Sequence, residues 1–146
     1  MIYSSNKALF LYSMLIFIVA CTKDVTETDV AIPYVEVNER IDINDVQYNS
    51  LTNIGGWAYL SAGSRGIILY RESTSRVRAF ERHCTYDPTE VCSQVDMDGA
   101  LLQAHDSDCC GSIFSIATRT IIKGPAIKPL LEYSTQFDGT HVQVTN

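Results

Sequence analysis

From Ile32 onward the chain consists of short strand-like segments separated by turn residues. Alternating or continuously apolar runs predict strands at 34–38, 40–43, 66–70, 77–80, 101–104, 113–116, 131–137 and 141–144. Asp138-Gly139, between the last two runs, predicts a hairpin. Only 46–51 suggests a helical turn. The sequence therefore predicts an all-β antiparallel domain, built as a sandwich or a barrel.

The N-terminus has the pattern of a secretion signal. Lys7 precedes an apolar run over 8–20 that is too short to span a bilayer comfortably. This run ends in Ile18-Val19-Ala20-Cys21, which resembles the bacterial lipobox, where the cysteine is lipidated and becomes the mature N-terminus. We therefore expect a lipoprotein signal peptide over 1–20 and a flexible tether over 21–30 that starts at lipidated Cys21.

Charge and export signals indicate where the protein works. Lys23-Asp24 is similar to the surface-export signals of Bacteroidetes lipoproteins, which implies an outer-membrane anchor and leaves its periplasmic or surface face open. The formal net charge is −6 and the basic residues are scattered, which argues against a nucleic-acid partner. The expected partners are the membrane, through the N-terminal lipid, and an envelope protein that the sequence does not identify.

Four cysteines remain besides Cys21, and an exported protein is expected to oxidise them. A bridge between the neighbours Cys109 and Cys110 would close a strained ring. Two patterns then stay open from the residues alone. One pairs Cys84 with Cys109 and Cys92 with Cys110, and the other pairs Cys92 with Cys109 and Cys84 with Cys110.

Three motifs in the second half resemble those of Rieske domains, the antiparallel β modules that carry a [2Fe–2S] cluster on two loops. Residues 77–86 resemble the strand that enters the first cluster loop, which in the family ends Cys-x-His. Residues 107–114 resemble the second loop, Cys-Pro-x-His-Gly-Ser-x-Phe, and 123–126 resemble a Gly-Pro-Ala turn. The resemblance implies one Rieske-like β domain over 31–146, a length that suits a single domain with its own core.

The cluster ligands implied by this resemblance are mostly replaced. In the family two thiolates hold one iron and two imidazoles hold the other. Cys84 matches the first thiolate, but Tyr86 stands at the first histidine, Ser107 at the second thiolate and Cys110 at the second histidine. No shift of the alignment restores the set. We therefore expect that the [2Fe–2S] cluster is lost and that no other cofactor replaces it.

The same resemblance implies one of the two disulfide patterns. Many Rieske domains link their loops through an extra cysteine after the first motif and the residue just before the second histidine, which correspond to Cys92 and Cys109. This leaves Cys84 and Cys110 to pair across the space of the cluster. The two loops are therefore expected to be cross-linked.

These observations predict a lipid-anchored structural or interaction module rather than an enzyme, since no catalytic motif stands out. One alternative is an electron-transfer protein that keeps a [2Fe–2S] cluster with atypical ligands. Another is a thiol–disulfide oxidoreductase that uses Cys109 and Cys110 as a vicinal pair. A mononuclear zinc site that adds His83 or His105 to the cysteines is a further alternative.

Overall fold

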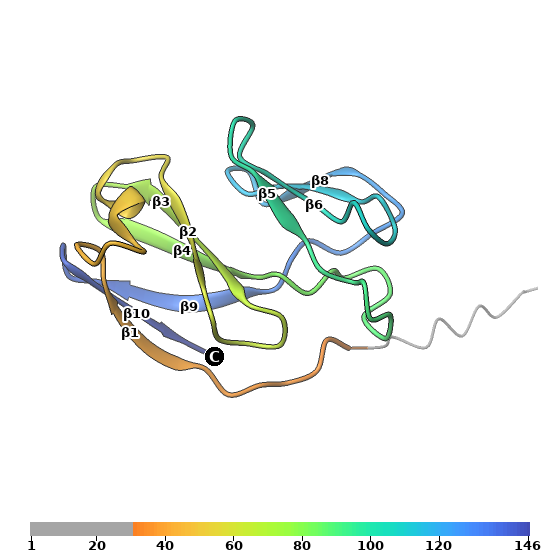
Figure 1. Cartoon of the computed structure of the whole chain (residues 1–146), viewed down its shortest axis with the longest axis horizontal. Helices are drawn as coiled ribbons and strands as arrows, with labels where there is room; N and C mark the ends of the chain where they lie inside the picture. Colours follow the sequence, from red (N-terminus) through yellow and green to blue (C-terminus); the bar gives the residue numbers. More distant parts are fainter. Residues whose placement is uncertain (1–30) are drawn as a thin grey trace, which may run out of the picture.

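The computed structural model describes residues 31–146, which form two antiparallel sheets that lie beside each other (Figure 1). The large sheet has six strands in the order β1-β10-β9-β4-β3-β2. Their bounds are Asn38–Asp42 (β1), His141–Thr145 (β10), Glu132–Phe137 (β9), Arg76–Glu81 (β4), Ile67–Ser73 (β3) and Trp57–Leu60 (β2). The small sheet has the order β5-β6-β7-β8. Its strands are Asp96–Asp98 (β5), Gln103–His105 (β6), Ile113–Ser115 (β7) and Thr120–Lys123 (β8).

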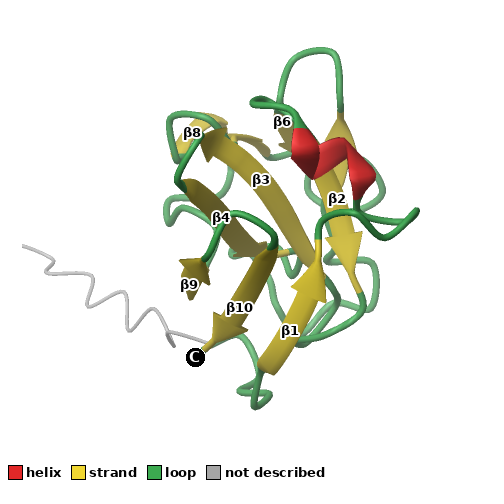
Figure 2. Cartoon of the chain, turned by 90° about the vertical axis from the view of Figure 1, so that its left-hand side faces the viewer, coloured by secondary structure: helices red, strands yellow, loops and turns green. Residues whose placement is uncertain are grey.

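The large sheet curls around a core of its own (Figure 2). All six of its strands contribute buried apolar side chains to this first core, and Leu51 of the short 3-10 helix η1 (Asn49–Thr52) packs into it as well. A second core joins the two sheets. It contains Phe80 from β4 together with Ala104, Phe114 and Ile116 from the small sheet and the turn after β7.

Strand β3 serves both cores, which explains why its sequence is a continuous apolar run. Ile67 and Leu69 point into the first core, whereas Ile68 and Tyr70 point into the second. Successive side chains of a strand face opposite sides of its sheet, so a strand that is covered on both sides needs apolar residues at every position. The small sheet is thereby packed against the outer face of the large one.

The predicted all-β class is confirmed, with differences in individual segments. The runs at 66–70, 77–80, 113–116, 131–137 and 141–144 lie largely in β3, β4, β7, β9 and β10. The predicted hairpin joins β9 to β10, where Gly139 has a φ of 101°. Residues 34–37 are not a strand, and the helical turn forms at Asn49–Thr52 rather than over 46–51. Among residues 31–146 no helix has the length and apolarity needed to cross a membrane.

Three connections meet at one end of the small sheet. The first loop, 82–95, leads from β4 to β5; the second loop, 106–112, joins β6 to β7; and the third, 124–131, leads from β8 back to β9. The Thr85 hydroxyl donates a hydrogen bond to the Lys128 carbonyl oxygen (2.6 Å), which ties the first loop to the third. The signal peptide 1–20, lipidated Cys21 and the tether 21–30 lie outside the described residues.

Candidate functional site

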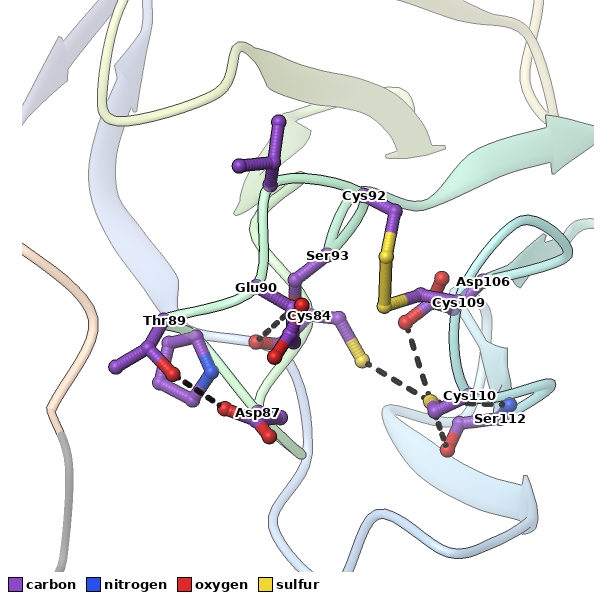
Figure 3. Close-up of a disulfide and its surroundings, with 12 residues drawn as sticks. Cys84, Asp87, Thr89, Glu90, Cys92, Ser93, Asp106, Cys109, Cys110 and Ser112 are labelled. Carbon is purple, nitrogen blue, oxygen red and sulfur yellow. Dashed lines mark hydrogen bonds between the residues drawn. A yellow bond between two sulfur atoms is a disulfide. The ribbon is translucent and has the colours of Figure 1, made fainter.

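A disulfide joins the first loop to the second (Figure 3). It connects Cys92 with Cys109, whose Cα atoms are 5.3 Å apart. The predicted cross-link of the two loops is thus confirmed in this pair, and the pattern with Cys84–Cys109 and Cys92–Cys110 is wrong. The vicinal pair of the oxidoreductase alternative is not formed, because Cys109 is bonded to Cys92.

The other predicted bridge, Cys84–Cys110, is not formed. Both residues are free thiols, and their sulfur atoms lie 3.7 Å apart in a hydrogen-bonding contact. Cys84 is fully buried and belongs to the second core, while Cys110 packs at the edge of that core. Burial, reinforced by the nearby Asp106 carboxylate, raises the pKa of the Cys84 thiol well above its usual range, so this thiol is protonated at neutral pH.

Asp106 completes this group. Its carboxylate Oδ2 accepts a hydrogen bond from the Cys110 thiol at 3.1 Å, and the residue is only 1% exposed. Figure 3 shows the Cys84 sulfur and the Asp106 carboxylate converging on the Cys110 sulfur. One oxygen and the two sulfurs all lie within 4.8 Å of one another. The alternation of side chains along β6 could have identified Asp106. Residues two apart in a strand face the same side of the sheet, and Ala104, two residues before Asp106, is buried.

The backbone of the second loop fixes these side chains. The Asp106 N–H donates to the Ser112 carbonyl oxygen (3.0 Å), and the Gly111 N–H donates to the Asp106 carbonyl oxygen (2.7 Å). Gly111 has a φ of 73°, a conformation that glycine adopts without the strain of a side chain. The tight turn between Asp106 and Ser112 therefore directs Cys110 toward Cys84.

Ser112 contacts the Cys110 sulfur through both its hydroxyl group and its backbone. Its Oγ lies 3.0 Å from the Cys110 sulfur, and its backbone N–H lies 3.4 Å from the same atom. The Ser112 oxygen also accepts a hydrogen bond from the Ala126 N–H of the third loop (2.9 Å). Since Ser112 is fully buried, its hydroxyl has a fixed position between the second and third loops.

The other positions that match Rieske ligands do not join this group. The Tyr86 side chain is 51% exposed, and Ser107 is exposed on the second loop. The donors that meet are therefore two thiols and one carboxylate. A Rieske cluster needs two thiolates on one iron and two imidazoles on the other, so this donor set does not fit it.

Neither histidine near the loops belongs to the group. His105 Nε2 contacts the Gln103 amide oxygen at 3.2 Å. His83 is buried under the first loop, where its Nε2 donates to the Pro88 carbonyl oxygen (2.8 Å) and its Nδ1 lies 2.9 Å from the Ser64 hydroxyl. Burial lowers the pKa of His83, which keeps it neutral at physiological pH. The zinc alternative with a histidine ligand has no support in these positions.

A buried carboxylate, Glu81, anchors the base of the first loop. It is the last residue of β4 and is fully buried. Its two oxygens accept hydrogen bonds from four donors. These donors are the backbone N–H groups of Ser64 (2.8 Å), Arg65 (3.0 Å) and His83 (3.0 Å), and the Tyr133 hydroxyl (2.7 Å).

The turn between β2 and β3 is shaped around this carboxylate. Gly63 has a φ of 73°, and a Cβ at this position would come within 2.5 Å of a Glu81 oxygen. The Arg65 guanidinium donates to the carbonyl oxygens of Glu90 (2.8 Å) and Val91 in the first loop. The first loop, and with it Cys84, is therefore held by the large sheet as well as by the disulfide.

Comparison with known proteins agrees with this arrangement of strands and loops. A scan of protein-family models and a search of curated proteins found no match. Among solved structures, the chain is similar to the crystal structure of the cyanobacterial plasma membrane Rieske protein PetC3 from Synechocystis PCC 6803. The two share 23% identity with a TM-score of 0.53, over 77% of this chain and 100% of the other. The described domain thus has a Rieske-like fold.

Proposed function

We propose that the protein is a lipid-anchored envelope protein whose Rieske-like domain holds no [2Fe–2S] cluster and serves as a disulfide-stabilised structural or interaction module. The observation that carries this proposal is where the structure places the residues at the four ligand positions. Cys84 and Cys110 face each other, while Tyr86 and Ser107 are exposed to solvent. No imidazole is within the group, so the donor set for the histidine-bound iron is missing.

The exposed ends of the loops support an interaction role. Apolar side chains on the first and third loops are open to solvent: Tyr86 is 51% exposed, Val91 87% and Ile127 70%. The bond between Thr85 and Lys128 holds these two loops together beside Tyr86 on the first loop and Ile127 on the third. Exposed apolar side chains that gather at one place favour contact with a partner protein.

Iron and acid-labile sulfide analysis tests the loss of the cluster. The protein is purified without air from its native envelope, and we expect a colourless product with no stoichiometric iron or sulfide. Cys84 alone matches a family ligand, and one thiolate is not expected to hold a cluster. A brown product with iron and sulfide in equal amounts would instead support the electron-transfer alternative.

Cell fractionation tests the anchor. We expect the wild-type chain in the membrane fraction and the Cys21→Ala variant outside it, because lipid chains on Cys21 would provide the anchor. The PetC3 structure belongs to a plasma membrane protein, which supports a membrane location in general terms. Thr26→Ala, a substitution in the same N-terminal segment that leaves every cysteine in place, serves as the control. Equal membrane binding of wild type and Cys21→Ala would exclude the lipid anchor.

A further inference from the structure

We propose that Cys84, Asp106 and Cys110 bind one zinc ion, with the fourth coordination position open to water. The site goes beyond the proposed function and does not depend on the lipid anchor. Two thiolates and one carboxylate are ligands that Zn²⁺ accepts. Three protein ligands with an open fourth position are the pattern of zinc sites that can bind a further molecule.

The distance between the two sulfurs matches a shared tetrahedral ion. Two thiolates that each lie about 2.3 Å from one zinc ion are about 3.8 Å apart at the tetrahedral angle. The sulfurs of Cys84 and Cys110 are separated by 3.7 Å. A disulfide would require a sulfur–sulfur distance of about 2.05 Å. The two loops therefore present the cysteines at the spacing of metal ligands.

The Asp106 carboxylate provides the second, independent observation. Its Oδ1 is buried and has no hydrogen-bond partner among residues 31–146. A buried carboxylate oxygen without a donor is costly, because it has lost water and gained nothing in exchange. A cation bound between Asp106 and the two sulfurs would satisfy the carboxylate without any change in the backbone of the second loop.

Ser112 is placed to stabilise a thiolate at Cys110. Its hydroxyl oxygen already accepts from the Ala126 N–H, so its own proton is available to the sulfur at 3.0 Å. The Ser112 N–H points to the same sulfur at 3.4 Å. Such donors around a bound ligand typically change metal affinity by about 10-fold to 100-fold. The hydroxyl and N–H thus form a ready outer shell for the metal-bound Cys110.

Charge and access are compatible with metal entry. Binding of Zn²⁺ displaces the two thiol protons to solvent, so two positive charges arrive and two leave, and the net charge of the group is unchanged. A surface pocket of about 230 Å³, lined by Asp106 with His105, Ser107 and Lys123 among others, opens beside the second loop. This pocket brings solvent up to the loop that carries Asp106.

Cobalt titration tests the site, with Co²⁺ as a coloured substitute for zinc. The full chain is purified from membranes in detergent without air, and alkylation with mass spectrometry verifies that Cys84 and Cys110 are free. We expect one equivalent of Co²⁺ with thiolate-to-cobalt charge-transfer bands and the intense visible bands of a tetrahedral complex. Loading of the metal-free site should release two protons per ion, and Zn²⁺ should then displace Co²⁺ without further proton release.

Variants of the second loop make the test specific. Asp106→Asn and Cys110→Ser should weaken binding at least about 100-fold, and Ser112→Ala about 10-fold. Asp108→Asn, an exposed carboxylate two residues from Asp106, is the matched control and should bind as wild type does. Circular dichroism and the retained Cys92–Cys109 bond establish that each variant is folded.

Three results would overturn the zinc site. They are the absence of cobalt binding by wild type with Cys84 and Cys110 free, equal binding by wild type and Asp106→Asn, or a Cys84–Cys110 disulfide in protein isolated from its native envelope. Iron and sulfide measured in the same preparation separate this failure from failure of the proposed function. A preparation free of iron and unable to bind cobalt refutes only the zinc site, whereas a loaded cluster refutes the cluster-free module.

Discussion

Replacing Glu81 by alanine is expected to lower the free energy of unfolding by about 4 kcal/mol, because a buried hydrogen-bond network loses its common acceptor. Four donors converge on its two oxygens, and three of them are backbone N–H groups that cannot turn away. Once Glu81 is gone they stay buried without a partner. Urea unfolding followed by circular dichroism at pH 7 measures this loss.

Two further variants show that the effect belongs to the acceptor. Glu81→Gln keeps one acceptor oxygen and replaces the other with an amide group that donates, so we expect an intermediate loss of about 2 kcal/mol. Glu39→Ala, at an exposed position of β1, removes a glutamate without a buried network and should change stability by at most about 0.5 kcal/mol. Similar losses for Glu39→Ala and Glu81→Ala would contradict the anchoring role of Glu81.

Removal of the Cys92–Cys109 disulfide is the second change with a large expected effect. The bond spans a sequence separation of 17 residues, for which the reduced entropy of the unfolded chain corresponds to about 3 kcal/mol. The Cys92→Ala/Cys109→Ala double variant should therefore unfold at a clearly lower urea concentration than the oxidised wild type. The measurement is made in a metal chelator so that ion binding does not contribute.

Reduction of the wild type provides the matched comparison. Treatment with a phosphine reductant should lower wild-type stability to the level of the double variant, and should leave the double variant unchanged. Because Cys84 and Cys110 are free thiols, the reductant has no second bond to break. A double variant as stable as the oxidised protein would show that other contacts hold the two loops together.

Strands with a strong pattern could be predicted from the sequence, and strands defined by their neighbours could not. The apolar run of β3 and the alternation of β10 were sufficient because each strand buries side chains in a core. Strand β5 has the sequence Asp-Met-Asp, which contains little that favours a strand. It forms because β6 supplies an antiparallel partner, and this pairing depends on contacts distant from any local signal.

The cysteines of the site could be predicted from the sequence, but the free state of two thiols and the contribution of Asp106 could not. The resemblance to Rieske loops correctly paired Cys92 with Cys109. It also paired Cys84 with Cys110. These two residues are in contact in the structure, but as free thiols rather than as a disulfide. Asp106 joins the group because the turn of the second loop brings Ser112 back against it. This contact is visible only in the three-dimensional structure.

The two cores have a consequence for how such a domain can change over evolutionary time. Two of the positions at which this chain departs from cluster-bearing sequences, Tyr86 and Ser107, contribute to neither core. Point substitutions at these positions alter the available ligands while the packing of the strands stays as it was. A fold that separates its scaffold from the donor atoms of its loops in this way allows those donors to change while the domain stays folded.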